Sequence, residues 1–171
     1  MTETLQRAFR VAAFDRPTAR KLLFDTSATC DAVLLVAAIE AVVAVALMIA
    51  TGSFGLSFFV ESVILGVASW LFLAAAIWLM GTKLLKGTGA IESVFRVTGF
   101  ARLPLLLGVL DGFLGSNLPG QVGLLWYLGV VVVVVGVALG LGWKEALGAV
   151  VLGAAAVLLI QLIFRAPFFR I

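Results

Sequence analysis

Glu40 is the residue most able to do chemistry in this chain, because it lies inside a long apolar stretch. It stands about nine residues into the block Ala32–Ala50, or roughly 13 Å along a helix that rises 1.5 Å per residue. A charge at that depth of a bilayer is costly, so the carboxyl must face protein or water, or carry a proton. Two interpretations stay open: an ion or proton site, or a neutral Glu40 that bonds a neighbouring helix and fixes packing.

Few polar residues are available to pair with Glu40. Gln161 lies in the last apolar block, Ser69 lies in the second, and Arg102 lies near the start of the third. The sequence does not choose among them. We take Glu40, Gln161 and Arg102 as the candidate intramembrane polar site.

Pro104 lies in the third apolar block, where it removes one backbone donor. The missing donor predicts a kink or a local break in that helix. Broken helices mark transport sites in some membrane proteins. The alternative is a kinked helix that only packs against its neighbours.

Residue types needed for common enzyme chemistry are missing. The chain has no histidine, which removes the commonest general base and metal ligand, and it has a single cysteine, Cys30. It contains no G-x-S-x-G, no H-E-x-x-H, no complete G-x-G-x-x-G and no P-loop. We therefore expect no catalytic residues, no metal site and no cofactor, and hence no enzyme.

The elements that must position these residues are membrane spans. Hydrophobic residues make up 63% of the chain and charged residues 12%, whereas typical globular proteins carry about 25% charged residues. Backbone groups in lipid must pair within their own segment, so long apolar blocks predict helices, and they lack the alternation of a barrel. The prediction is an all-α, polytopic transmembrane helical bundle. Its five spans are about Ala32–Ala50, Ser62–Met80, Val97–Leu114, Val122–Leu141 and Glu145–Phe164.

Basic residues predict the orientation of the spans. Ten of the twelve lie before the first span, in the second and fourth connections, or just inside the third block, and two follow the fifth span. The positive-inside rule then puts the N-terminus in the cytoplasm. Basic residues lie between apolar blocks and form no basic surface, so we expect no binding of nucleic acid. Trp126 and Tyr127 fall near the predicted outer boundary, at a depth that such rings favour.

Residues 1–31 form a separate basic, cytoplasmic, amphipathic segment ahead of the membrane domain of residues 32–171. Leu5 and Phe9 share one helical face, while Arg7 and Arg10 share another. Asp15 precedes Arg16-Pro17, which predicts the start of a second helix. The segment either lies on an anionic membrane surface or forms an ordered cytoplasmic cap that recognises no lipid.

Small residues at helical spacing indicate close helix packing. Gly108 and Gly112 form one G-x-x-x-G, and Gly136 and Gly140 form another; Gly66 lies on a small-residue face of the second span. Such spacing lets membrane helices approach closely. Contacts inside one chain explain it at least as well as contacts in a dimer do.

In the order of its features the chain resembles the Yip family (Ypt/Rab-interacting membrane proteins), in particular its small bacterial members. An arginine-rich start with Asp15-Arg16-Pro17 precedes the first span, and Trp78-Leu79-Met80-Gly81 ends the second. The remaining features are Gly87-Thr88-Gly89, the stretch from Val97 through Gly99-Phe100 to Pro104, Leu125-Trp126, and Trp143-Lys144-Glu145-Ala146. Arg102 departs from the apolar pattern of the 97–104 stretch.

The resemblance implies a five-span bundle with a cytoplasmic N-terminus. Eukaryotic members bind small GTPases and one another in vesicle traffic, and the family offers no catalytic residues to transfer. We expect a non-enzymatic scaffold or interaction protein, multi-pass in the cell membrane and, given the bacterial resemblance, in the inner membrane. Its partners would be the lipid bilayer and further copies or other membrane proteins. The alternative is a small transporter, channel or lipid-handling protein that uses Glu40 and the Pro104 break.

Overall fold

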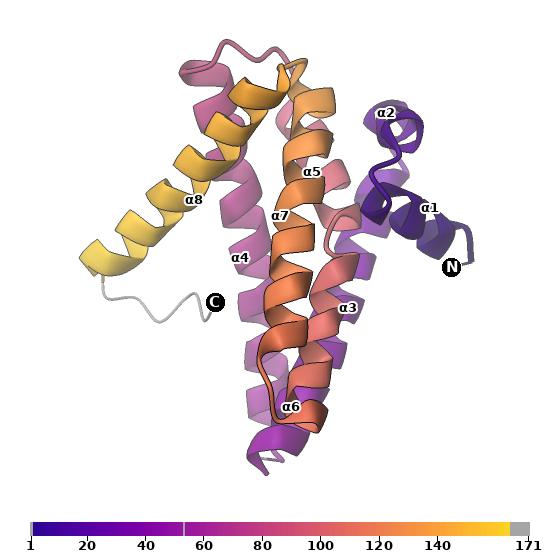
Figure 1. Cartoon of the computed structure of the whole chain (residues 1–171), viewed down its shortest axis with the longest axis vertical. Helices are drawn as coiled ribbons and strands as arrows, with labels where there is room; N and C mark the ends of the chain where they lie inside the picture. Colours follow the sequence, from indigo (N-terminus) through magenta and orange to yellow (C-terminus); the bar gives the residue numbers. More distant parts are fainter. Residues whose placement is uncertain (1, 53, 165–171) are drawn as a thin grey trace.

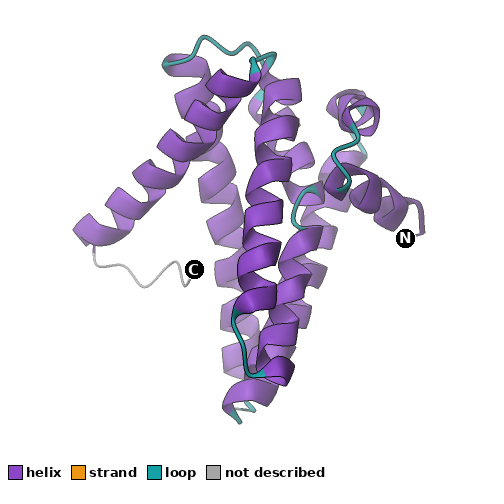
Figure 2. Ribbon diagram, in the orientation of Figure 1, coloured by secondary structure: helices purple, strands orange, loops and turns teal. Residues whose placement is uncertain are grey.

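The computed structural model describes residues 2–52 and 54–164, and this part of the chain is helical, without strands (Figure 2). Two short helices come first, and the long helices follow. The elements in chain order are α1 Thr2–Ala12, α2 Arg16–Phe24, α3 Ala28–Thr51, α4 Leu56–Lys83, α5 Ile91–Phe100, the 3₁₀ helix η1 Leu103–Leu110, α6 Asp111–Leu114, α7 Leu118–Leu139 and α8 Trp143–Phe164.

Five stretches of the described chain are long and apolar enough to cross a membrane, which confirms the predicted all-α bundle of five spans. They are α3, α4, the combined stretch Ile91–Leu114, α7 and the first 18 residues of α8, Trp143–Ile160. The first four run side by side (Figure 1). The fifth, α8, packs mainly on α4 and diverges from α7 towards its C-terminal end (Figure 1).

The third span consists of three pieces. It begins at Ile91, not at Val97 as predicted, because Glu92 and Arg96 are part of its first helix, α5. These two charged residues precede the apolar block, and charged residues are typical of connections between spans, so this part of α5 was predicted as a connection. Arg102 consequently lies eleven residues after the start of the span and twelve before its end, not near one boundary.

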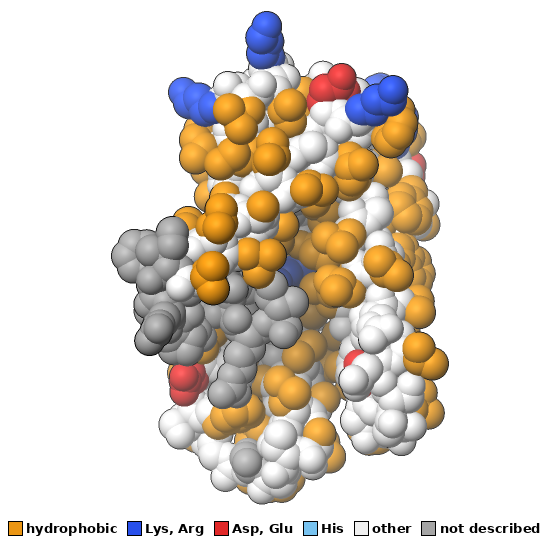
Figure 3. Space-filling view, turned by 60° about the vertical axis from the view of Figure 1, so that its left-hand side comes forward, with side chains coloured by type: hydrophobic (Ala, Val, Ile, Leu, Met, Phe, Trp, Pro, Cys, Tyr) orange, Lys and Arg blue, Asp and Glu red, His pale blue; other side chains and the backbone are white. Residues whose placement is uncertain are grey.

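Buried side chains gather where α3, α4, α5 and α7 meet. The largest is Trp70 of α4, which is 1% exposed and donates its indole N–H to Thr98 Oγ1 of α5 at 3.1 Å. This bond satisfies the indole inside an apolar core, where an unpaired donor would be costly. Many leucine, valine and phenylalanine side chains lie on the outside, and Figure 3 shows them over the flank of the bundle, with Lys and Arg side chains at one end. An apolar flank of this kind suits contact with lipid.

The two N-terminal helices pack on the bundle and do not form a separate tail. α1 contacts α5 and α7, and α2 contacts the same two helices (Figure 1). Trp126 of α7 donates its indole N–H to the carbonyl of Ala12 at 2.8 Å, and the ring of Phe14 lies over Gly129. The indole of Trp126 thus bonds α1 and Tyr127 is buried, two contacts that the prediction of rings at the outer boundary did not include.

Candidate functional site

Glu40 and Arg102 form an ion pair in the middle of the bundle. The Nη1 atom of Arg102 donates to Oε1 of Glu40, and the two side chains are 9% and 16% exposed respectively. Glu40 lies twelve residues after the start of α3 and eleven before its end, and Arg102 has the same central position in its own span. The pair therefore brings two opposite charges together at the depth where a single charge is most costly.

Gly66 of α4 completes the site. Its carbonyl accepts a second bond from Nη1 of Arg102 at 3.3 Å. A Cβ atom at Gly66 would overlap the side chain of Glu40, so the carboxylate lies directly against the α4 backbone. A side chain at this position would displace the carboxylate from its place, and the three spans meet at this point through one acid, one base and one glycine.

Tyr127 of α7 adjoins the pair and was missed by the sequence analysis. It is 4% exposed and lies close enough to Arg102 and Glu40 to interact with both charges. Tyr127 follows Trp126 in the sequence, and two adjacent aromatic residues resemble an interfacial belt, so its place in the core was not predicted. Residues 126 and 127 in fact point in different directions, one to the N-terminal helices and one into the core.

The turn between α5 and η1 sets the position of Arg102. α5 ends at Phe100, and the N–H of Arg102 bonds the carbonyl of Gly99 at 3.3 Å. The carbonyl of Arg102 accepts from Leu105, while Pro104 lies in the first turn of η1, where a missing N–H costs least. The helix changes from α to 3₁₀ next to the only proline of this span, and the guanidinium projects from the junction.

One donor of this site has no partner in the described part of the chain. Nε of Arg102 is buried and makes no hydrogen bond there. A guanidinium carries five N–H donors, and a buried donor without an acceptor costs free energy. This N–H is available to a water molecule or an anion.

Apart from Gly66, the glycines singled out from the sequence do not join this cluster. Gln161 belongs to α8, and its side chain is outside the described residues. Gly108 lies in η1 near Gly120, whereas Gly112 lies in α6 near Ala50, so this G-x-x-x-G does not form one helical face.

The second glycine pair is also divided. Gly136 approaches Ala146 at the start of α8, but Gly140 follows α7 and ends it with a left-handed backbone (φ +66°). Glycine adopts that conformation without steric cost. Gly140 is therefore a helix terminator, and the spacing that suggested a packing motif has a different cause at this position.

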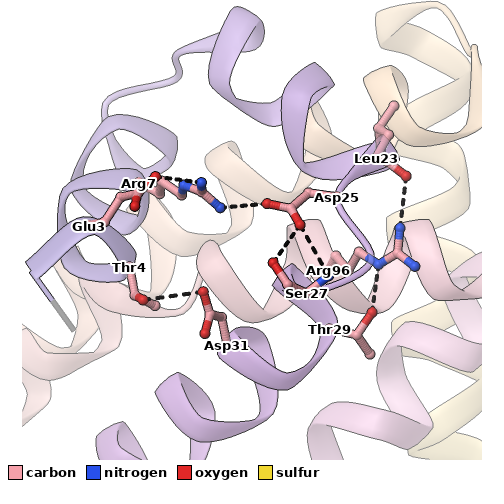
Figure 4. Close-up of polar contacts among 9 residues, drawn as sticks. All are labelled: Glu3, Thr4, Arg7, Leu23, Asp25, Ser27, Thr29, Asp31 and Arg96. Carbon is pink, nitrogen blue, oxygen red and sulfur yellow. Dashed lines mark hydrogen bonds and ion pairs between the residues drawn. The ribbon is translucent and has the colours of Figure 1, made fainter.

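A second polar cluster holds the N-terminal helices together (Figure 4). Arg7 of α1 donates to Glu3 at 2.6 Å and to Asp25 at 2.7 Å. These bonds raise the pKa of Arg7, the bond to Asp25 contributing most. The hydroxyl of Ser27, and then Arg7, hold the pKa of the Asp25 carboxyl below its usual value.

Arg96 joins this cluster to the third span. Its Nε donates to Thr29 at 2.6 Å and its Nη1 donates to the carbonyl of Leu23 at 2.8 Å (Figure 4). Thr4 of α1 donates to Asp31 in the first turn of α3 at 3.2 Å. The N-terminal helices are therefore ordered by side chains from α3 and α5 as well as by their own.

Comparison with known proteins identifies the chain. The model of the Yip1 domain matches residues 16–165, from the first residue of α2 to just beyond α8. Neither the curated proteins nor the solved structures compared with the chain gave a match. Since the matched region includes all five spans, this chain is a multi-pass membrane protein that belongs to the Yip family.

Proposed function

We propose that this protein is a non-enzymatic interaction protein of the bacterial inner membrane, which assembles with further copies of itself or with other membrane proteins. The observation that carries the proposal is that the intramembrane charges bond to groups of the protein itself. Glu40, Arg102 and Gly66 bond one another across three spans. Their charges thus hold the bundle together, and an ion pair of this kind supplies neither a nucleophile nor a free general base.

The ordered N-terminal helices support the same proposal. They are fixed to the bundle by Trp126, Arg96 and Thr4, and expose Phe9 and Phe24 at 63% and 87%. A firmly placed, partly apolar surface can bind a partner without the cost of ordering a free tail.

The test combines two measurements on the full chain. Size-exclusion chromatography with light scattering in mild detergent gives the mass of the protein part, and photo-cross-linking in cells captures neighbours. We would place the photoreactive residue at Phe9, with a matched control at Leu71 on the flank of α4. We expect an assembly larger than one chain, or a specific adduct from position 9 that position 71 does not give. A monomer without adducts from either position would refute the proposal.

A second candidate is a small transporter or lipid-handling protein centred on the same residues. It is favoured by the helix discontinuity beside Pro104 together with the buried, unpaired Nε of Arg102. Half-helices and free donors at mid-membrane characterise sites for anionic substrates in transporters. Unchanged flux in proteoliposomes of Glu40→Gln, measured against the wild type, would remove this candidate.

A further inference from the structure

A polar cavity of about 260 Å³ lies between α1 and α2. Its charged lining consists of Glu3, Arg7 and Arg10 of α1, Lys21 of α2, and Asp25 directly after α2. Pockets for drug-sized ligands are typically about 300–1,000 Å³, so this cavity suits a smaller group. It is separate from the intramembrane ion pair described above.

Some charged side chains of this cavity are paired and others are not. Arg7 binds both carboxylates, Glu3 and Asp25, as Figure 4 shows. Arg10 and Lys21 also line the cavity, yet across residues 2–52 and 54–164 neither side chain has a hydrogen bond or an ion pair. The lining contains three cations and two anions, so its net charge is one positive charge. Both anions are bonded to Arg7, which leaves Arg10 and Lys21 as the two cations without an acceptor. The cavity therefore favours a ligand with a single negative charge and several acceptor oxygens.

The cavity lies beside apolar side chains that suit the membrane interface. α1 buries Ala8 and Val11 against the bundle and leaves Leu5 and Phe9 exposed on a neighbouring face. Its polar residues Glu3, Arg7 and Arg10 occupy a third face, which forms one wall of the cavity. A helix that divides polar and exposed apolar side chains in this way suits a site where a charged headgroup and its acyl chains are bound together.

We propose that the α1–α2 cavity binds the phosphate group of a phospholipid headgroup. A phosphodiester carries one negative charge and acceptor oxygens that arginine and lysine side chains recognise. Arg10 and Lys21 would donate to the phosphate oxygens, while Arg7, held by two carboxylates, keeps the wall in place. The exposed Leu5 beside it would contact an acyl chain of the same lipid.

The test uses the full chain in a neutral detergent and native mass spectrometry, with phosphatidylglycerol as the lipid probe. The variant Arg10→Gln/Lys21→Gln removes the two unpaired cations. Its matched control, Arg16→Gln/Arg20→Gln, removes the same charge from exposed positions of α2 outside the cavity. Since hydrogen bonds to charged groups are strong, we expect the cavity variant to bind the lipid at least about ten-fold more weakly than the wild type, and the control to bind nearly as well. Circular dichroism shows whether each variant keeps its helices.

Three outcomes would overturn the proposal. Equal losses in the two variants would mean general attraction between a basic segment and an anionic lipid. Undiminished lipid binding by a folded cavity variant would mean that the cavity holds no lipid phosphate. The third arm uses inorganic phosphate and glycerol phosphate as competitors: if they displace the lipid at millimolar concentration, the ligand is a soluble phosphate and the assignment to a headgroup is wrong.

Discussion

The ion pair between Glu40 and Arg102 shows how one bundle accommodates two charges in its interior. Each charge alone would be costly at mid-membrane, and together they replace the water that each has lost. The two partners are not equivalent, because a carboxylate can be neutralised by binding a proton, whereas an arginine in a protein stays charged. The effect of breaking the pair should therefore depend on which partner is removed.

We predict that Glu40→Gln destabilises the protein more than Arg102→Gln. The first change leaves a buried guanidinium without a counter-charge, which costs about 3 kcal/mol or more in buried pairs. The second leaves a carboxyl that can take up a proton. The double variant should recover most of the loss, since it holds no charge at this depth. Thermal unfolding of the full chain in detergent, followed by circular dichroism, measures all three.

Glu61→Gln is the control for this experiment, because Glu61 is an exposed acid of α4. It should leave the unfolding temperature unchanged. If Arg102→Gln proves as damaging as Glu40→Gln, or the double variant is the least stable, the pair does not serve to neutralise a buried charge.

The sequence was sufficient to select Glu40 and Arg102 but not to join them. A charged residue in an apolar block is visible without coordinates, and its cost follows from the solvent alone. The partner of Glu40 depends on which faces of α3, α4 and the third span meet, and on a carbonyl, that of Gly66, which no side-chain pattern reveals. Tyr127 was missed because it follows Trp126, and two adjacent aromatic residues resemble an interfacial belt.

At the scale of elements, the N-terminal helices are the part whose placement depends most on polar contacts. α1 and α2 were expected as a basic amphipathic segment, and α2 begins as predicted, with Arg16 first and Pro17 in its first turn. Their attachment was not predictable, because it depends on Trp126 and Arg96 from distant parts of the chain. In the third span, the apolar block was predicted as a helix, but the charged turns of α5 that precede this block were not.

We predict that the docking of α1 weakens in acid. The Asp25 carboxyl has a lowered pKa when it accepts from Ser27 and Arg7, so it binds its proton less tightly in the docked state than in a free segment. The docked state is therefore favoured at pH values above the ordinary value of about 3.9, and this contribution is lost as the pH falls through the lowered value. Amide hydrogen exchange in α1, corrected for the intrinsic effect of pH, measures the docking.

Asp25→Asn should give faster exchange of α1 at pH 7, because the neutral amide is a weaker partner for Arg7. It should also reduce the acid-dependent change seen in the wild type. Glu92→Gln, at an exposed acid of α5, serves as the control. Exchange in α1 that is identical in wild type and Asp25→Asn at both pH values would show that Asp25 does not hold this helix.

At the scale of the whole molecule, the sequence predicted the number of spans, because each of the five blocks is long and apolar enough to be recognised alone. The arrangement of the spans was not accessible to it. That α8 packs mainly against α4 and departs from α7 follows from side-chain contacts between helices far apart in the chain. The basic residues predict the orientation of the bundle, which cysteine labelling tests directly.

We predict that the α4–α5 and α7–α8 connections face the cytoplasm. In a Cys30→Ser background, single cysteines at Lys83 and Lys144 should not react with an impermeant maleimide on intact cells, whereas cysteines at Ser57 and Asn117 should. All four positions are exposed in the structure, so access to solvent does not bias the comparison. Labelling at 83 or 144 without permeabilisation would show that the bundle has the opposite orientation.

Two of the bonds that hold the N-terminal helices end on main-chain oxygens, those of Ala12 and Leu23. A main-chain acceptor persists whatever side chain its residue carries. Mutations on the outward faces of α1 and α2 can therefore accumulate during evolution while both anchors from the bundle stay intact. Sister proteins that diverge in this way would keep one common platform and display different exterior chemistry on it.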